Sequence, residues 1–84
     1  MNYGKTRNVD DINTALKEFT TYLNMAPAND YFLAAVYYYR GVCYGEKGDY
    51  KTAYNDAMMA LTIKPDYEPA KLMIKLIEKE QMKQ

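Results

Sequence analysis

The stretch that decides the fold is Ala34–Pro65, which reads AAVYYYRGVCYGEKGDYKTAYNDAMMALTIKP. Large and small side chains follow a fixed order in it. Tyr37 and Tyr44 are large, whereas Gly41 and Ala53 are small at the positions where two helices would cross most closely. Composition alone does not produce this order, which predicts one helix–turn–helix unit of about 34 residues.

In the rest of the chain, too, the spacing of apolar residues predicts α-helices, so the whole chain is expected to be all-α. Apolar residues recur every three or four positions, and no segment alternates apolar and polar residues for long. The second helix is apolar nearly all round, so it must be covered on most sides or exposed for a reason. The predicted helices span Val9–Asn24, Tyr31–Lys47, Tyr50–Lys64 and Glu68–Met82.

Residues that start and stop helices stand at the ends of these segments. Asn8 is a suitable N-cap for the first helix, and Asn29 or Asp30 can cap the second. Gly48 is a natural C-terminal stop for the second helix, and Asp49 then caps the third. These capping and stop residues therefore predict four separate helices.

The composition narrows the classes of function. The 84 residues allow one domain, 1–84, and 11 basic residues balance 11 acidic ones, so no basic surface for nucleic acid is expected. There is no histidine, Cys43 is the only cysteine, and no motif combines a nucleophile, a base and an oxyanion site. No apolar run approaches the roughly 20 residues that span a bilayer. We predict a cytoplasmic, non-catalytic protein with no cofactor, metal or membrane partner.

The same residues resemble the tetratricopeptide repeat (TPR) family, whose repeats begin with the spacing W-x2-L-G-x2-Y. Two of those positions are substituted here. The residues that carry the resemblance are Tyr37, Arg40, Gly41, Tyr44, Gly48, Ala53, Ala57, Ala60 and Pro65. The resemblance implies a full repeat at 34–67, a preceding half-repeat and a capping helix at 68–82. Residues 1–8 are expected to form a flexible N-terminus. It also implies two stacked antiparallel helix–turn–helix units, the start of an α–α superhelix.

Arg40 stands where the family most often has leucine. An arginine that points into a seam between helices needs a carboxylate partner, and Asp56 lies one turn after Ala53 on the facing helix. The alternative is that Arg40 extends to water and Asp56 is an ordinary surface residue. We favour a pair between Arg40 and Asp56.

The resemblance also implies a site, because the first helix of each TPR repeat lines a concave groove. The family's clamp for a C-terminal carboxylate needs lysine and asparagine, and this chain has Tyr38 and Val42 in those positions. An apolar, aromatic groove instead favours an apolar segment of a partner protein. Two alternatives remain: a self-associating scaffold that dimerises through the same surface, or leucines that complete a small core. The predicted groove residues are Ala35, Tyr38, Tyr39, Val42, Gly45, Leu72 and Leu76.

Overall fold

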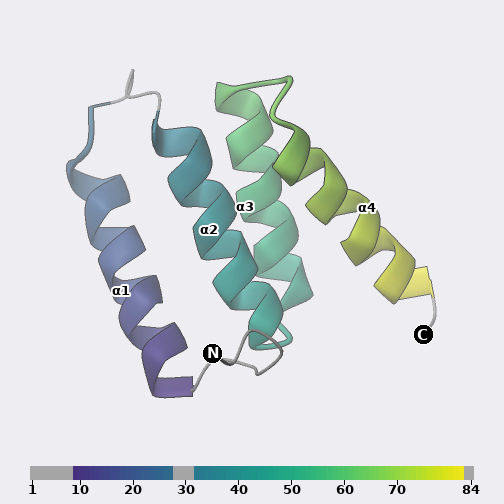
Figure 1. Ribbon diagram of the computed structural model, residues 1–84, viewed down its shortest axis with the longest axis horizontal. Helices are drawn as coiled ribbons and strands as arrows, with labels where there is room; N and C mark the ends of the chain where they lie inside the picture. Colours follow the sequence, from purple (N-terminus) through teal and green to yellow (C-terminus); the bar gives the residue numbers. More distant parts are fainter. Residues whose placement is uncertain (1–8, 28–31, 83–84) are drawn as a thin grey trace, which may run out of the picture.

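A computed structural model of the chain describes residues 9–27 and 32–82. Four α-helices follow one another with alternating direction (Figure 1), and the described residues contain no strand. The prediction of an all-α fold made of antiparallel helix pairs is confirmed, with every helix boundary within one residue of the expected one. The helices are α1 (Val9–Met25), α2 (Phe32–Glu46), α3 (Tyr50–Ile63) and α4 (Glu68–Met82).

The turn between α2 and α3 has the predicted chemistry. Gly48 adopts φ +84°, a left-handed conformation that glycine accepts without steric cost, and it ends α2. The Asp49 carboxylate then accepts a hydrogen bond from the backbone N–H of Thr52 at 3.2 Å and caps α3. The predicted caps Asn8, Asn29 and Asp30, and the expected flexible segment 1–8, lie outside the described residues.

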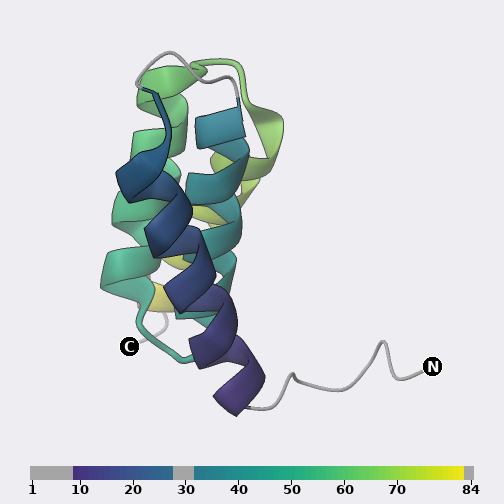
Figure 2. The ribbon, with the colours of Figure 1, turned by 90° about the vertical axis from the view of Figure 1, so that its left-hand side faces the viewer.

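Each helix packs mainly against its neighbours in the sequence: α1 on α2, α2 on α3, and α3 on α4. Turning the molecule by 90° shows α1 lying across the front of the other helices (Figure 2). α4 leans away from α3 toward its C-terminal end (Figure 1). The side of α2 that faces α4 is therefore only partly covered.

The core forms in two places along this row of helices. Small residues of α2, α3 and α4 make one cluster: Ala34, Ala57, Ala60 and Ala70, each no more than 1% exposed. Their size lets the helix backbones approach closely, and larger side chains such as Tyr37 and Tyr38 pack around them. The second cluster joins α1 to α2 through Ile12, Leu16 and Cys43. Cys43 is fully buried, as expected for a small apolar side chain.

Arg40 and Asp56 pair across α2 and α3, as predicted. Arg40 Nε lies 2.9 Å from Asp56 Oδ2, and Arg40 Nη2 lies 2.8 Å from Asp56 Oδ1. The Arg40 Cζ atom also lies 5.5 Å from the ring centroid of Tyr37 and 5.9 Å from that of Tyr44. The hydrogen bond to Asp56 raises the pKa of Arg40 above its ordinary value. This pair fixes the orientation of α3 against α2.

Gly41 marks the closest approach of three helices in this part of the fold. A Cβ atom at Gly41 would stand 3.2 Å from the Ala53 carbonyl oxygen, 3.2 Å from Asp56 Cβ and 3.2 Å from Met73 Sδ. These atoms belong to α3 and α4. The missing side chain therefore lets α3 pack tightly on α2, and it lets Met73 of α4 reach the same point.

Candidate functional site

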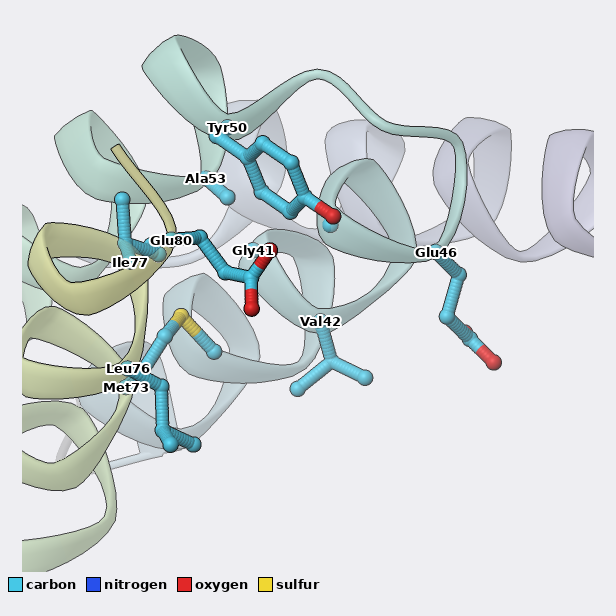
Figure 3. Close-up of a pocket in the computed structure, with 10 residues that line it drawn as sticks. Gly41, Val42, Glu46, Tyr50, Ala53, Met73, Leu76, Ile77 and Glu80 are labelled. Atoms are coloured by element: carbon cyan, nitrogen blue, oxygen red, sulfur yellow. The ribbon is translucent and has the colours of Figure 1, made fainter. Parts of the chain in front are cut away.

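Two adjoining hollows lie between α2 and α4, and together we call them the α2–α4 groove. Val42, Met73 and Leu76 border both hollows. The first hollow is completed by Tyr38, Pro69 and Leu72. The second, shown in Figure 3, has a volume of about 260 Å³ and is completed by residues of α2, α3 and α4: Gly41, Gly45, Glu46, Tyr50, Ala53, Ile77 and Glu80.

Helical spacing brings these residues to one surface. Tyr38, Val42 and Gly45 lie at intervals of four and three residues on α2, so they share one face of that helix. Leu72 and Leu76 lie four residues apart on α4 and share the facing side. The structure therefore brings together five of the seven residues that the sequence predicted for the groove.

The two leucines are the most unusual members of the site. Leu72 is 58% exposed and Leu76 is 64% exposed, although both stand opposite apolar residues of α2. These exposed fractions show that neither leucine folds inward to complete the core, whereas Met73 of the same helix reaches the surface beside Gly41. An apolar surface that is hollowed and open to solvent results.

The other two predicted residues, Ala35 and Tyr39, border neither hollow. Tyr39 points toward α1, where its ring stacks on Phe19 with a centroid distance of 6.3 Å and an interplanar angle of 18°. Successive residues of a helix are about 100° apart around the axis, and here that step turns Tyr39 toward Phe19 of α1 while Tyr38 faces the groove. Ala35 is half-buried one turn before them.

An aromatic row connects this surface to the rest of the fold. The Tyr38 ring lies 5.3 Å from the Tyr39 ring and 5.9 Å from the Tyr67 ring, the latter in an edge-to-face arrangement. Partial burial raises the pKa of the Tyr67 hydroxyl above its ordinary value. The row joins α1, α2 and the residue that precedes α4. These ring contacts therefore position Tyr38 at the edge of the first hollow.

Sequence reasoning missed the floor of the groove and its acidic end. Met73 forms the floor, while Glu46 and Glu80 stand beside the second hollow. The sequence contains a signal for both glutamates, since Glu46 follows Val42 by four residues and Glu80 follows Leu76 by four. Continuing the predicted groove by one helical turn would have found both carboxylates.

The described residues offer no other obvious chemical site. No group of three or more histidine, cysteine, aspartate or glutamate side chains among them is placed to hold a metal ion. None of the four described helices combines the length and the apolar character that crossing a bilayer requires. Compared with known proteins, the chain matches no protein-family model, no curated protein and no solved structure.

Proposed function

We propose that this chain is a non-catalytic protein–protein interaction module of the tetratricopeptide repeat type, which holds an apolar or aromatic segment of a partner protein in the α2–α4 groove. The observation that carries the proposal is the exposure of Leu72 and Leu76 opposite Tyr38 and Val42. Contiguous apolar surface on a small protein usually marks an interface. Covering a leucine side chain is worth about 1.5–3 kcal/mol, so two exposed leucines can drive binding.

The chemistry of the groove supports a protein segment as the ligand. Both hollows are lined mainly by apolar side chains, which suits the apolar side chains of a partner segment. Among the residues that the structure describes, no lysine or arginine borders either hollow, which disfavours a nucleic-acid backbone. The tyrosine and methionine in the lining are residue types enriched at protein interfaces.

Self-association is the alternative function, and the same exposed leucines favour it. A second copy could cover them in a symmetric dimer in which both copies use the same surface. Light scattering at micromolar concentration separates the two functions by the mass of the particle. A dimer that becomes monomeric when Leu72 and Leu76 are replaced by serine would establish the alternative.

The partner-binding function can be tested with peptides selected from a random displayed library on the wild-type protein. Their affinity is then measured for a Leu72→Ser, Leu76→Ser variant. The matched control is Met58→Ser, Met59→Ser, because these methionines are 43% and 42% exposed on α3 and border no part of the groove. We expect the leucine variant to lose at least tenfold in affinity and the methionine variant to lose little. Equal affinities for both variants would contradict the proposal.

A further inference from the structure

The aromatic row at the edge of the first hollow offers a second kind of chemistry beside the leucines. It consists of Phe19 of α1, Tyr39 and Tyr38 of α2, and Tyr67 just before α4. Neighbouring ring centroids lie 6.3, 5.3 and 5.9 Å apart in that order. Tyr39 is 52% exposed, and the other three rings are half-buried. The row therefore presents aromatic surface to the solvent from three parts of the chain.

The three tyrosines of the row carry hydroxyls that are open to a ligand. Within the part of the chain that the structure describes, the hydroxyls of Tyr38, Tyr39 and Tyr67 form no hydrogen bond. Partial burial, together with the nearby Tyr39 and Tyr38, raises the pKa of Tyr67 above its ordinary value. Its hydroxyl therefore keeps its proton at neutral pH and can donate it to an acceptor.

The surface that adjoins the row carries no charge. Tyr38 also borders the first hollow, and no other residue of this described lining is charged: Val42, Pro69, Leu72, Met73 and Leu76. A ligand that matches this surface therefore needs apolar groups to cover the rings, acceptors for the hydroxyls and no charge along the contact. These are requirements of charge and hydrogen-bond complementarity.

A proline-rich segment in the polyproline II conformation meets all three requirements. Proline rings are uncharged and apolar, and such segments dock on aromatic surfaces. The conformation has no internal hydrogen bonds, so its carbonyl oxygens are free to accept, and proline brings no N–H that would need a partner. The segment rises about 3.1 Å per residue, so two residues match the 6.3 and 5.9 Å between neighbouring rings.

Other occupants match this surface less well. An α-helix uses its carbonyl oxygens for its own hydrogen bonds, so it would cover the three hydroxyls without giving them acceptors, which is unfavourable. A second copy of this chain presents helices and faces the same objection. An extended strand binds by pairing with the edge of a sheet, and the described residues contain no strand.

We infer that the partner segment is proline-rich and binds in the polyproline II conformation across the aromatic row; this inference rests on the proposed function and names the chemistry of its ligand. The proline rings pack on Phe19, Tyr38 and Tyr39, and the carbonyl oxygens of the segment accept hydrogen bonds from the tyrosine hydroxyls. The segment continues past Pro69 to Leu72, where an apolar side chain covers the leucine. About six residues cover the four rings.

The probe for this inference is a fluorescein-labelled peptide of ten prolines, measured by fluorescence anisotropy. Two comparison peptides of equal length and charge are a flexible glycine–serine peptide and an amphipathic leucine–alanine helix. The test variant is Tyr39→Phe, Tyr67→Phe, which keeps both rings and removes two hydroxyls. Its control is Tyr54→Phe on α3, because Tyr54 is half-buried like Tyr67 but borders no part of the α2–α4 groove.

We expect saturable binding of the proline peptide, and roughly tenfold weaker binding to Tyr39→Phe, Tyr67→Phe, the loss expected for two hydrogen bonds. Tyr54→Phe should keep full affinity. Tyr39→Ala, which also removes a ring, should weaken binding further, and thermal unfolding of the same sample checks that this variant is folded. The inference is overturned if the proline peptide does not bind at millimolar concentration, if the leucine–alanine helix binds more tightly, or if the phenylalanine variant loses nothing.

The leucine variant separates this inference from the proposed function. Peptides selected from the random library should lose affinity for Leu72→Ser, Leu76→Ser if the proposed function holds. If they do, while the proline peptide fails to bind or is indifferent to the tyrosine hydroxyls, the proposed function stands and the inference fails. If neither the selected peptides nor the proline peptide depends on these leucines and tyrosines, both are wrong.

Discussion

Arg40 donates two hydrogen bonds to Asp56, from Nε at 2.9 Å and from Nη2 at 2.8 Å, and this bidentate pair joins α2 to α3. The two partners differ in their access to water. The Asp56 side chain is 4% exposed, whereas the Arg40 side chain is 19% exposed and also has Thr20 Oγ1 at 3.4 Å. The cost of breaking the pair should therefore depend on which partner is removed.

We predict that Arg40→Met destabilises the fold more than Asp56→Ala. Arg40→Met leaves a buried carboxylate without its cation and should cost roughly 3 kcal/mol of unfolding free energy. Asp56→Ala leaves a guanidinium that keeps its tyrosine rings and some water. The double variant should be more stable than Arg40→Met alone, since no lone buried charge remains. Urea unfolding of the three variants measures this, and a coupling free energy near zero would contradict the pair.

Two glycines of α2 should respond in opposite directions to the same substitution. Gly41→Ala places a Cβ 3.2 Å from a backbone oxygen, which cannot swing aside as a flexible side chain can. We expect it to lower the unfolding free energy by about 1 kcal/mol or more, and Gly41→Leu by roughly 1–3 kcal/mol or more. A Cβ at Gly45 meets nothing within 4 Å, so Gly45→Ala should raise stability by up to about 1 kcal/mol. Thermal unfolding of the two alanine variants side by side checks this, and equal shifts would show that the close approach at Gly41 is wrong.

Asp49 should make the stability of the fold depend on pH in the acid range. Hydrogen bonding to Thr52, from its side chain and its backbone N–H, lowers the pKa of Asp49 below its ordinary value, because the charged form is the better acceptor. The folded state therefore binds this proton less well than the unfolded state. Its stabilising effect is present above the unfolded pKa of about 3.9 and is lost as the pH falls through the lower folded value.

The matched variant for this effect is Asp49→Asn, which keeps a capping oxygen but does not titrate. We expect the wild type to lose stability relative to Asp49→Asn as the pH falls below about 4, and the difference to be constant above about pH 5. Guanidinium unfolding across this range measures it. A difference that stays constant down to about pH 2 would show that Asp49 is not a charged cap.

The helices could be read from the sequence because their signals are local. Gly48 and Asp49 act within their own turn, and the alanine spacing of α3 depends only on the period of the helix. The seam between α2 and α3 was also predictable, because an arginine facing a helix needs a carboxylate within reach. The resemblance to the tetratricopeptide repeat stays a prediction, since it depends on more than the helices.

The groove was predictable only in part. Helical spacing placed Tyr38, Val42, Leu72 and Leu76, but it could not give the direction in which α4 leans away from α3. That direction depends on how α4 packs against α3 and on contacts between distant residues, such as the approach of Met73 to Gly41. It leaves the leucines exposed and opens the second hollow. Non-local packing of this kind has no signature in one segment of sequence.

Tyr38 has a double role, since it borders the groove and packs against the alanine cluster of the core. Tyr38→Ala should therefore lower the unfolding free energy by about 3 kcal/mol, near the lower limit for deleting a buried aromatic side chain. Tyr38→Phe keeps the ring contacts with Tyr39 and Tyr67 and should change stability little. Thermal unfolding distinguishes the two. If Tyr38→Ala keeps the wild-type melting temperature, the ring contributes nothing to the core.

The most direct test of the α2–α4 groove as a binding site is a substitution that fills the second hollow with a side chain and leaves the fold intact. Gly45 borders the second hollow, and a Cβ atom added there meets nothing within 4 Å. Gly45→Leu should keep or raise the unfolding free energy by up to about 1 kcal/mol, because leucine favours a helix over glycine by that amount. The new side chain would occupy the space beside Val42 and Leu76 that a ligand needs.

Peptides selected on the wild type should therefore bind Gly45→Leu at least tenfold more weakly, while Gly45→Ala, with its smaller side chain, should lose less. Fluorescence anisotropy and urea unfolding of the same samples keep binding and stability apart. Lower affinity in a protein of undiminished stability can only come from the occupied hollow or its immediate rim. Full affinity for Gly45→Leu would show that the peptides bind another surface, and the α2–α4 groove would then no longer be the candidate site.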